Sequence, residues 1–356
     1  MTWLDEITPK HIQELVPYAS ARREALSGEV WLNANENPYI GPTPEGLSQL
    51  NRYPECQPEQ LTDGFARYAG VKQEQVLVTR GIDEGIDLLT RAFCISGEDS
   101  IIYTPPTYGM YKISAETNNI GVMAVPLESD WSLDVQGILQ EVSSSKLIYL
   151  CSPNNPTGSL LDREEICKII EAAAGEALVV VDEAYVEFTP ESSMVSLLSK
   201  CPNLVVMRTL SKAFGLAGLR CGFLLASPEI IQVLQKVSAP YPIPVPVVDI
   251  AREALSERGI DSMMRDVETL TKDRDKLSDL LKEFSFIRQI YPSSANFILF
   301  QVKDTTGVMR FLLDRGVVIR NQSSQPGLDN TLRVSVGTES EIEEFYQKMK
   351  AYEASL

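Results

Sequence analysis

One lysine, with hydroxyl side chains before it and an arginine after it, has the residue types and spacing that most directly suggest chemistry. The apolar run 204–207 leads into Thr209, Ser211 and Lys212, and Arg220 follows eight residues after the lysine. A lysine amine can form a Schiff base with an aldehyde cofactor, and hydroxyls with a guanidinium can hold the phosphate of that cofactor. A lone Ser-Lys pair after a buried strand is more often a surface lysine, so this interpretation depends on what lies upstream.

Two turns upstream have the composition of ligand-binding loops. Arg80-Gly81-Ile82-Asp83 follows the run 76–79, and Asn155 lies in the proline-bracketed segment 151–158. A glycine turn that opens a helix presents backbone N–H groups to an anion, and open α/β sheets place their sites where strands end. Each turn alone is weak evidence, because Gly, Asn and Pro are also the residues of ordinary turns.

An acid and an aromatic residue also follow predicted strands. Asp182 ends the run 178–181, and Tyr108 lies in the segment 104–109. A carboxylate at the end of so apolar a strand needs a partner, and a pyridinium N–H would be one. Tyr108 could lie flat beside a heterocyclic ring. The simpler explanations, a helix N-cap for Asp182 and a core position for Tyr108, are about equally good for each residue taken alone.

Composition excludes several classes of function. The chain has 356 residues and a net charge of −17, which opposes binding to nucleic acid. It shows neither a signal peptide nor an uninterrupted apolar run of membrane-spanning length, so we expect no membrane association and a cytoplasmic location. The six cysteines form no CxxC pair, so we expect no disulfide framework and no metal site. The only histidine, His11, excludes an HExxH zinc site and is interpreted as a solvated residue on the first helix.

The order of β-rich and helical segments predicts an α/β fold with two domains. Continuously apolar runs that alternate with helical patterns are typical of a mostly parallel sheet covered on both faces. Proline occupies every second position from Pro240 to Pro246, which predicts a stiff, extended lead into a second domain. After it we expect one long helical stretch over 248–283 and then an α+β pattern. The predicted division is an N-terminal arm at 1–45, a large domain at 46–245 and a small C-terminal domain at 246–356. The seven expected strands of the large domain are 76–79, 101–103, 122–125, 147–150, 178–181, 204–207 and 222–225.

The features before Lys212, in this order, resemble the fold type I pyridoxal-phosphate-dependent aminotransferases. The likeness extends to the histidinol-phosphate aminotransferase branch of class II, and it covers nearly the whole chain. It is carried by Leu32-Asn33-Ala34-Asn35-Glu36-Asn37-Pro38, Arg52-Tyr53-Pro54-Glu55-Cys56-Gln57-Pro58, the stretch 80–116 and Leu332-Arg333-Val334-Ser335-Val336-Gly337-Thr338. The resemblance implies a fold type I transferase, with a seven-stranded mostly parallel sheet in the large domain and a smaller α+β domain.

The resemblance also implies a role for each residue around the cofactor ring. Lys212 would be the Schiff-base lysine and, once released, the base that moves the proton. Asp182 would pair with the ring nitrogen, Tyr185 and Asn155 would hydrogen-bond the ring oxygen, and Tyr108 would stack on the ring. Asp182, Tyr185 and Lys212 would be the catalytic residues.

The cofactor phosphate and the substrates would be held by further groups. Tyr53 would reach the phosphate from a partner subunit, so a homodimer would share each site. Arg333 would take the α-carboxylate of glutamate, and the substrate phosphate would lie among Arg333, Arg320 and Tyr18, with Asn35 also near the substrate. For Arg320 the simpler explanation, a surface arginine after a strand, is the weaker of the two but stays open. Besides Tyr53, the predicted phosphate ligands are Thr209, Ser211, Arg220 and the backbone of Ile82 and Asp83.

The implied activity is a reversible transamination, in which L-glutamate and imidazole-acetol phosphate give 2-oxoglutarate and L-histidinol phosphate, in histidine biosynthesis. Three alternatives stay open at this point. A threonine-phosphate decarboxylase would use the same scaffold and lysine, a broad aromatic aminotransferase would not require a substrate phosphate, and a cofactor-binding regulator would need no catalytic lysine.

Overall fold

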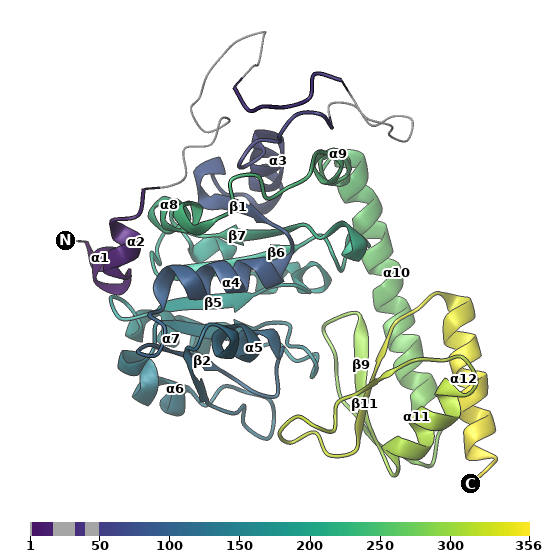
Figure 1. The fold of residues 1–356 in the computed structure, drawn as a ribbon. Coiled ribbons are helices and arrows are strands. Elements are labelled where there is room, and N and C mark those ends of the chain that lie inside the picture. Colours follow the sequence, from purple (N-terminus) through teal and green to yellow (C-terminus); the bar gives the residue numbers. More distant parts are fainter. Residues whose placement is uncertain (1, 17–32, 40–49) are drawn as a thin grey trace.

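The structure, a computed structural model, describes residues 2–16, 33–39 and 50–356. Two sheets lie side by side in it, and the long helix α10 runs from the larger sheet to the smaller one (Figure 1). The helices are α1 (Trp3–Ile7), α2 (Lys10–Gln13), α3 (Glu59–Ala69), α4 (Ile82–Phe93), α5 (Met110–Thr117), α6 (Val135–Glu141), α7 (Arg163–Ala172), α8 (Pro228–Val237), α9 (Val245–Ala254), α10 (Glu257–Leu281), α11 (Thr305–Leu313) and α12 (Glu339–Glu353).

The larger sheet has seven strands in the order β1-β7-β6-β5-β4-β2-β3. Strands β3, β2, β4, β5 and β6 run parallel, and β7 is antiparallel to both of its neighbours. The sequence prediction of a seven-stranded, mostly parallel sheet is therefore confirmed. The strands are β1 (Val76–Thr79), β2 (Ser100–Tyr103), β3 (Gly121–Ala124), β4 (Leu147–Cys151), β5 (Leu178–Asp182), β6 (Leu204–Thr209) and β7 (Gly222–Leu225).

Helices cover both faces of this sheet. Alternate residues of one strand face opposite sides, so Tyr149 of β4 packs in the cluster with α4, α5 and α8, whereas Ile148 packs in the cluster with α3, α6, α7 and α9. Each residue of β4, β5 and β6 is buried. This explains why these strands are apolar without a polar alternation up to their carboxyl ends, where Asp182 of β5 and Arg208 of β6 lie.

The smaller sheet has four antiparallel strands in the order β10-β11-β9-β8. Its core combines the strands with α11, α12 and the end of α10, and includes Phe286, Phe300 and Phe345. The predicted α+β pattern after the proline run is confirmed. The strands are β8 (Ile287–Ile290), β9 (Phe297–Val302), β10 (Arg320–Asn321) and β11 (Thr331–Ser335).

Two predicted boundaries after Pro240 are wrong. The expected single helical stretch over 248–283 is two helices, α9 and α10, because Ser256 caps a new helix and accepts a hydrogen bond from the Gly259 N–H at 3.1 Å. The proline run is not extended throughout, since α9 begins at Val245 with Pro246 in its first turn. Proline is tolerated there because the N–H it lacks would have no partner within the helix.

The described N-terminal residues lie beside the larger sheet. Leu4 and Ile7 of α1 join its core, and Lys236 of α8 donates hydrogen bonds to the carbonyl groups of Ile12 and Gln13 in α2. His11 is solvated as predicted, but it lies on α2 and not on the first helix.

The division of the chain into an arm and two domains, at 45/46 and 245/246, remains a prediction. Among the described residues, no helix combines the length and apolar character needed to cross a membrane.

Candidate active site

A cavity of about 140 Å³ lies at the carboxyl ends of β4, β5 and β6, where they meet the start of α4. This is the edge at which open α/β sheets bind ligands. Every residue predicted to hold the cofactor lines this cavity, except Tyr53. The lining residues are Ile82, Asp83, Tyr108, Cys151, Asn155, Asp182, Ala184, Tyr185, Thr209, Ser211, Lys212, Ala217 and Arg220.

One end of the cavity is built to bind an anion. Gly81 caps α4 with φ 85°, and a Cβ placed there would lie 2.6 Å from Nη2 of Arg220. A Cβ on Gly222 would lie 2.7 Å from the carbonyl carbon of Gly81, so both positions require glycine. The N–H groups that open α4 therefore face the same space as the Arg220 guanidinium, whose Nη2 is 3.2 Å from Oδ2 of Asp83. A phosphate fits this arrangement.

The hydroxyl groups at this end belong to one turn. The Oγ1 of Thr209 donates a hydrogen bond to Oγ of Ser211 at 2.9 Å and accepts one from the Ser211 N–H at 3.1 Å. Arg220 itself has a left-handed backbone, φ 57° and ψ 54°, an uncommon conformation for a residue with a side chain. These bonds and this conformation bring the two hydroxyls and the guanidinium to one cavity.

Asp182 lies deep in the cavity and is only 2% exposed. Its Oδ1 accepts the Ala184 N–H at 3.0 Å, and its Oδ2 accepts the Tyr111 hydroxyl at 2.6 Å. Burial raises the pKa of Asp182 to about 6, although the hydrogen bond from Tyr111 opposes that rise. A buried carboxylate of this kind is stabilised by a cationic N–H donor.

Lys212 lies in the same cavity, with Nζ 5.4 Å from the centre of the Tyr185 ring. Burial lowers the pKa of Lys212 below its usual range, the charge of Arg333 lowers it further, and Asp182 acts in the opposite direction. Tyr185 is buried and packs edge-on against Phe297 of β9 at 5.3 Å. A lysine amine with a lowered pKa is a better nucleophile and base than a solvated one.

Tyr108 and Asn155 form other parts of the wall, and each already has a protein partner. The Tyr108 hydroxyl donates to Oδ1 of Asp83 at 2.8 Å, which holds the ring beside the start of α4. The Asn155 side-chain oxygen accepts a hydrogen bond from Nη1 of Arg333. Tyr108 therefore connects the cavity wall to the start of α4, and Asn155 connects it to Arg333 of the smaller sheet.

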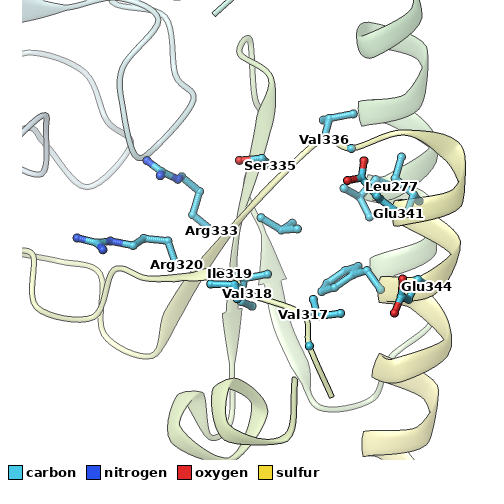
Figure 2. Close-up of a pocket in the computed structure, with 15 residues that line it drawn as sticks. Leu277, Val317, Val318, Ile319, Arg320, Arg333, Ser335, Val336, Glu341 and Glu344 are labelled. Atoms are coloured by element: carbon cyan, nitrogen blue, oxygen red, sulfur yellow. The ribbon is translucent and has the colours of Figure 1, made fainter. Parts of the chain in front are cut away.

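Arg333 and Arg320 are directly opposite each other on β11 and β10. Figure 2 shows that both side chains extend from the smaller sheet on the side away from Glu341 and Glu344 of α12. Arg333 is half-buried, and its guanidinium carbon is 5.1 Å from the centre of the Phe297 ring, whereas Arg320 is exposed. The pair forms a cationic region next to Asn155, where an anionic substrate group could bind.

Two further predicted residues, Tyr53 and Asn35, do not line this cavity. Tyr53 is 49% exposed and stacks on Tyr241 at 4.5 Å between ring centres. Asn35 has a left-handed backbone, φ 54°, and the next residue, Glu36, accepts the Tyr53 N–H at 2.7 Å and the Arg52 guanidinium at 2.7 Å. These contacts join the segments of Asn35 and Tyr53. Tyr18 lies outside the described residues.

Sequence reasoning missed four residues that touch the site. Cys151, Ala184 and Ala217 line the cavity, and Tyr111 bonds Asp182 from α5. Tyr111 had a detectable signal, because it lies in the first turn of a helix only three residues after the predicted site residue Tyr108. The alanines and the cysteine carry no such signal.

A buried ionic network, also missed, lies next to the cavity. Glu183, the residue after β5, accepts hydrogen bonds from Nε of Arg208 at 2.9 Å, from the Ser193 hydroxyl at 2.9 Å and from the Met194 N–H at 2.5 Å. Nη1 of Arg208 donates to Oε1 of Glu187 at 2.9 Å. Arg208 on β6 therefore joins the end of β5 to the turn that follows Tyr185.

The fold and the cavity together are those of a lysine-dependent transferase on an open α/β sheet, and the comparisons with known proteins agree. The chain matches the family "Aminotransferase class I and II" over residues 29–349. It belongs to this family.

Individual relatives narrow the comparison. The chain is 49% identical over 343 residues to a histidinol-phosphate aminotransferase of Pectobacterium carotovorum subsp. carotovorum, an alignment that covers 96% of each protein. The crystal structure of the histidinol-phosphate aminotransferase from Clostridium acetobutylicum has a TM-score of 0.80 at 24% identity, over 86% of this chain and 92% of that one. The enzyme from Sinorhizobium meliloti in complex with pyridoxal-5'-phosphate has a TM-score of 0.77 at 24% identity, over 85% of this chain and 83% of that one. The predicted fold type is confirmed.

Proposed function

We propose that the protein is a pyridoxal-phosphate-dependent histidinol-phosphate aminotransferase, which exchanges an amino group between L-histidinol phosphate and 2-oxoglutarate. The observation that carries the proposal is the single cavity that contains Lys212, the buried Asp182 and the anion-binding start of α4. The 49% identity to the Pectobacterium enzyme over nearly the whole chain supports the choice of substrate.

The lining of the cavity fits pyridoxal phosphate at both ends. The N–H groups of Ile82 and Asp83 with Thr209, Ser211 and Arg220 would hold its phosphate. Asp182 would accept a hydrogen bond from the ring nitrogen, Tyr185 and Asn155 would bind the ring oxygen, and Tyr108 would lie against the ring. When bound, the cofactor supplies an electron sink for the carbon that bears the amino group.

Lys212 would bind the cofactor covalently and then carry the proton between the substrate carbon and the cofactor. Its burial and the nearby Arg333 charge lower its pKa, so a larger fraction of the amine is neutral near pH 7 than for a solvated lysine. Proton transfer needs a base near the reacting atom, and Lys212 lies in the same cavity as Asp182 and Tyr185.

The two arginines would let one site accept two different anions. Arg333 would bind the α-carboxylate of glutamate, and Arg320 with Arg333 would bind the phosphate of histidinol phosphate, because a guanidinium fork suits both groups. Tyr18 and Asn35 would complete the substrate site. The pairing of Arg320 with Arg333 across β10 and β11 supports a shared role.

The assembly would be a homodimer in the cytoplasm, acting in histidine biosynthesis. Tyr53 is half-exposed and lies outside the cavity of its own chain, which fits a residue that completes the site of a partner subunit. Each active site would then need both chains.

Replacing Lys212 tests the proposal. Lys212→Ala should abolish turnover of L-histidinol phosphate with 2-oxoglutarate, while the variant still binds pyridoxal phosphate without a covalent bond. The exposed Lys200 provides the control, and Lys200→Ala should retain activity. Normal turnover in Lys212→Ala would overturn the assignment. Release of carbon dioxide from threonine phosphate by the unaltered protein would instead indicate the lyase.

Replacing Arg320 tests the substrate. Arg320→Ala should raise the KM for L-histidinol phosphate more than the KM for glutamate. The matched control is Arg310→Ala, which removes an exposed arginine from α11. Equal changes in the two KM values would remove the phosphate role of Arg320. Equal use of aromatic amino acids without a phosphate would favour a broad aromatic aminotransferase.

A further inference from the structure

We propose that Tyr111 is a positioning residue that holds the Asp182 carboxylate ionised and aimed at the ring nitrogen of the cofactor. This inference rests on the proposed function, because it needs a nitrogen heterocycle in the cavity. The observation behind it is the 2.6 Å hydrogen bond that the Tyr111 hydroxyl donates to Oδ2 of Asp182.

The Tyr111 ring is fixed by its packing. It is fully buried, stacks on Tyr149 with ring centres 4.7 Å apart and planes within 8°, and meets Tyr108 edge-on at 5.7 Å. A ring held on two sides directs its hydroxyl to one place. Tyr111 therefore contacts both Tyr108 and Asp182, which are two lining residues of the cavity.

Tyr111 and a backbone N–H each donate a hydrogen bond to a different oxygen of the Asp182 carboxylate. The Ala184 N–H donates to Oδ1 at 3.0 Å, and Tyr111 donates to Oδ2. Both donors are neutral, so neither satisfies the charge, and each oxygen keeps a further lone pair for a ligand. Asp182 is thus prepared to accept one more donor, and a cationic N–H is the donor that a buried carboxylate prefers.

The groups around Asp182 make this hydrogen bond important for its charge. Lys212 is the cation that stabilises the carboxylate, Asp83 opposes it, and the neutral hydroxyl and thiol groups nearby belong to Tyr108, Tyr185 and Cys151. Burial raises the pKa of Asp182 to about 6, and the Tyr111 hydrogen bond is the largest factor that opposes this. A hydrogen bond to the charged form lowers a pKa, so its removal raises the pKa toward neutrality.

Tyr149 provides a matched control. Its hydroxyl is buried, belongs to the other ring of the same stack, and has no hydrogen-bond partner among the described residues. Tyr111→Phe and Tyr149→Phe each remove one buried hydroxyl and keep the stack. Only the first removes a donor from Asp182.

The test measures the binding of two ligands to the full-length protein after removal of cofactor. The probes are pyridoxamine 5'-phosphate and its analogue in which a C–H replaces the ring nitrogen. For each ligand, the Kd of the variant is divided by the Kd of the unaltered protein at pH 5 to 8.5, so that titration of the ligand itself cancels.

The proposal predicts a loss that depends on both pH and the ring nitrogen. A hydrogen bond to a charged group shifts a pKa by about one unit, so Tyr111→Phe should bind pyridoxamine phosphate about tenfold more weakly at pH 5 and nearly normally at pH 8.5. The analogue should show no weakening, and neither should Tyr149→Phe with either ligand. In an Asp182→Asn background, Tyr111→Phe should have no further effect.

Three results would overturn the proposal. Equal weakening of both ligands at all pH values would mean that Tyr111 only supports the fold. If Tyr111→Phe bound pyridoxamine phosphate as tightly as the unaltered protein at every pH, Asp182 would not need the Tyr111 hydrogen bond. If the unaltered protein bound the two ligands equally well, the pairing of Asp182 with the ring nitrogen would itself fail, which is a failure of the proposed function and separate from the behaviour of Tyr111.

Discussion

Asp182 and Glu183 are adjacent, both are buried, and they have opposite surroundings. Glu183 faces Arg208 and accepts bonds from a guanidinium, a hydroxyl and a backbone N–H, so its charge is matched within the protein. Asp182 faces the cavity, and within the described part of the chain its donors are one neutral backbone N–H and one neutral hydroxyl. Two adjacent acids at the end of β5 therefore differ: the charge of Glu183 is matched by Arg208, and the charge of Asp182 remains open to the cavity.

The next strand, β6, repeats this division. Arg208 points into the ionic network, and one residue later Thr209 begins the turn that brings Ser211 and Lys212 to the cavity. Since successive residues of a strand point to opposite sides, a structural side and a ligand side can alternate along one strand. The comparison teaches that charge pairing, and not burial alone, distinguishes an acid matched within the protein from one that remains open to the cavity.

The largest expected effect is a loss of stability on disrupting the ionic network of Arg208, Glu183 and Glu187, which we call the structural side. Arg208→Met should lower the free energy of unfolding by about 3–5 kcal/mol, because it leaves the carboxylates of Glu183 and Glu187 buried without their cation. Urea denaturation measures this. Arg91→Met, which breaks a half-exposed pair with Asp87, should cost less than about 1 kcal/mol. If the two variants lost similar stability, the network would not be the structural side of the comparison.

Substitution of a residue that faces the cavity, which we call the ligand side, should lower activity and should not lower stability. Asp182→Asn should lower kcat by about a hundred- to a thousandfold, because in the proposed function the Asp182 carboxylate pairs with the cofactor ring and an amide cannot provide its charge. The unfolding free energy of the cofactor-free variant should not fall, since Asp182 makes no salt bridge with another described residue and burial of its charge is unfavourable. Steady-state assays and urea denaturation together separate the effects. A kcat within tenfold of normal would contradict the account.

A third prediction uses pH. The pKa of Asp182 is raised in the folded state to about 6 from 3.8, so the folded protein binds more protons than the unfolded chain between these values. Stability from this group therefore falls as pH rises. Without cofactor, Asp182→Asn should gain about 2 kcal/mol over the unaltered protein between pH 4.5 and 7.5. A pH-independent difference between the two proteins would show that Asp182 is not desolvated as described.

The smallest effect is expected within the network itself. Glu187→Gln should change the unfolding free energy by less than about 1 kcal/mol, because Oε2 of Glu187 has no partner among the described residues and Oε1 keeps Arg208. Glu183→Gln should cost more, since both of its oxygens accept hydrogen bonds. If urea denaturation showed equal losses of unfolding free energy for the two variants, Glu183 and Glu187 would contribute equally to the network.

Much of the fold and site could be predicted from sequence, because the relevant signals are local. The central strands of the larger sheet are mostly apolar runs. Asp182 is the last residue of β5, and Lys212 and Asn155 lie in the turns after β6 and β4. Strands that end at one edge bring such residues together without further information. Ligand-side residues were therefore accessible from spacing and resemblance.

The rest depended on contacts that sequence spacing does not reveal. Arg208 meets Glu187 from another segment, and Tyr111 meets Asp182 from 71 residues away in the chain. The break between α9 and α10 depends on a single serine cap, which the helical pattern around it obscured. Partner choice for a buried charge is a tertiary property, so the structural side of the comparison became visible only in the structure.

The most direct test of the central claim is one half-reaction. The protein loaded with pyridoxal phosphate is mixed with L-histidinol phosphate, with no 2-oxo acid present, and the cofactor absorbance is followed through a single turnover. The account predicts conversion to the pyridoxamine form in the unaltered protein and none in Lys212→Ala. An unchanged spectrum in the unaltered protein would contradict the assignment of this cavity to histidinol-phosphate transamination.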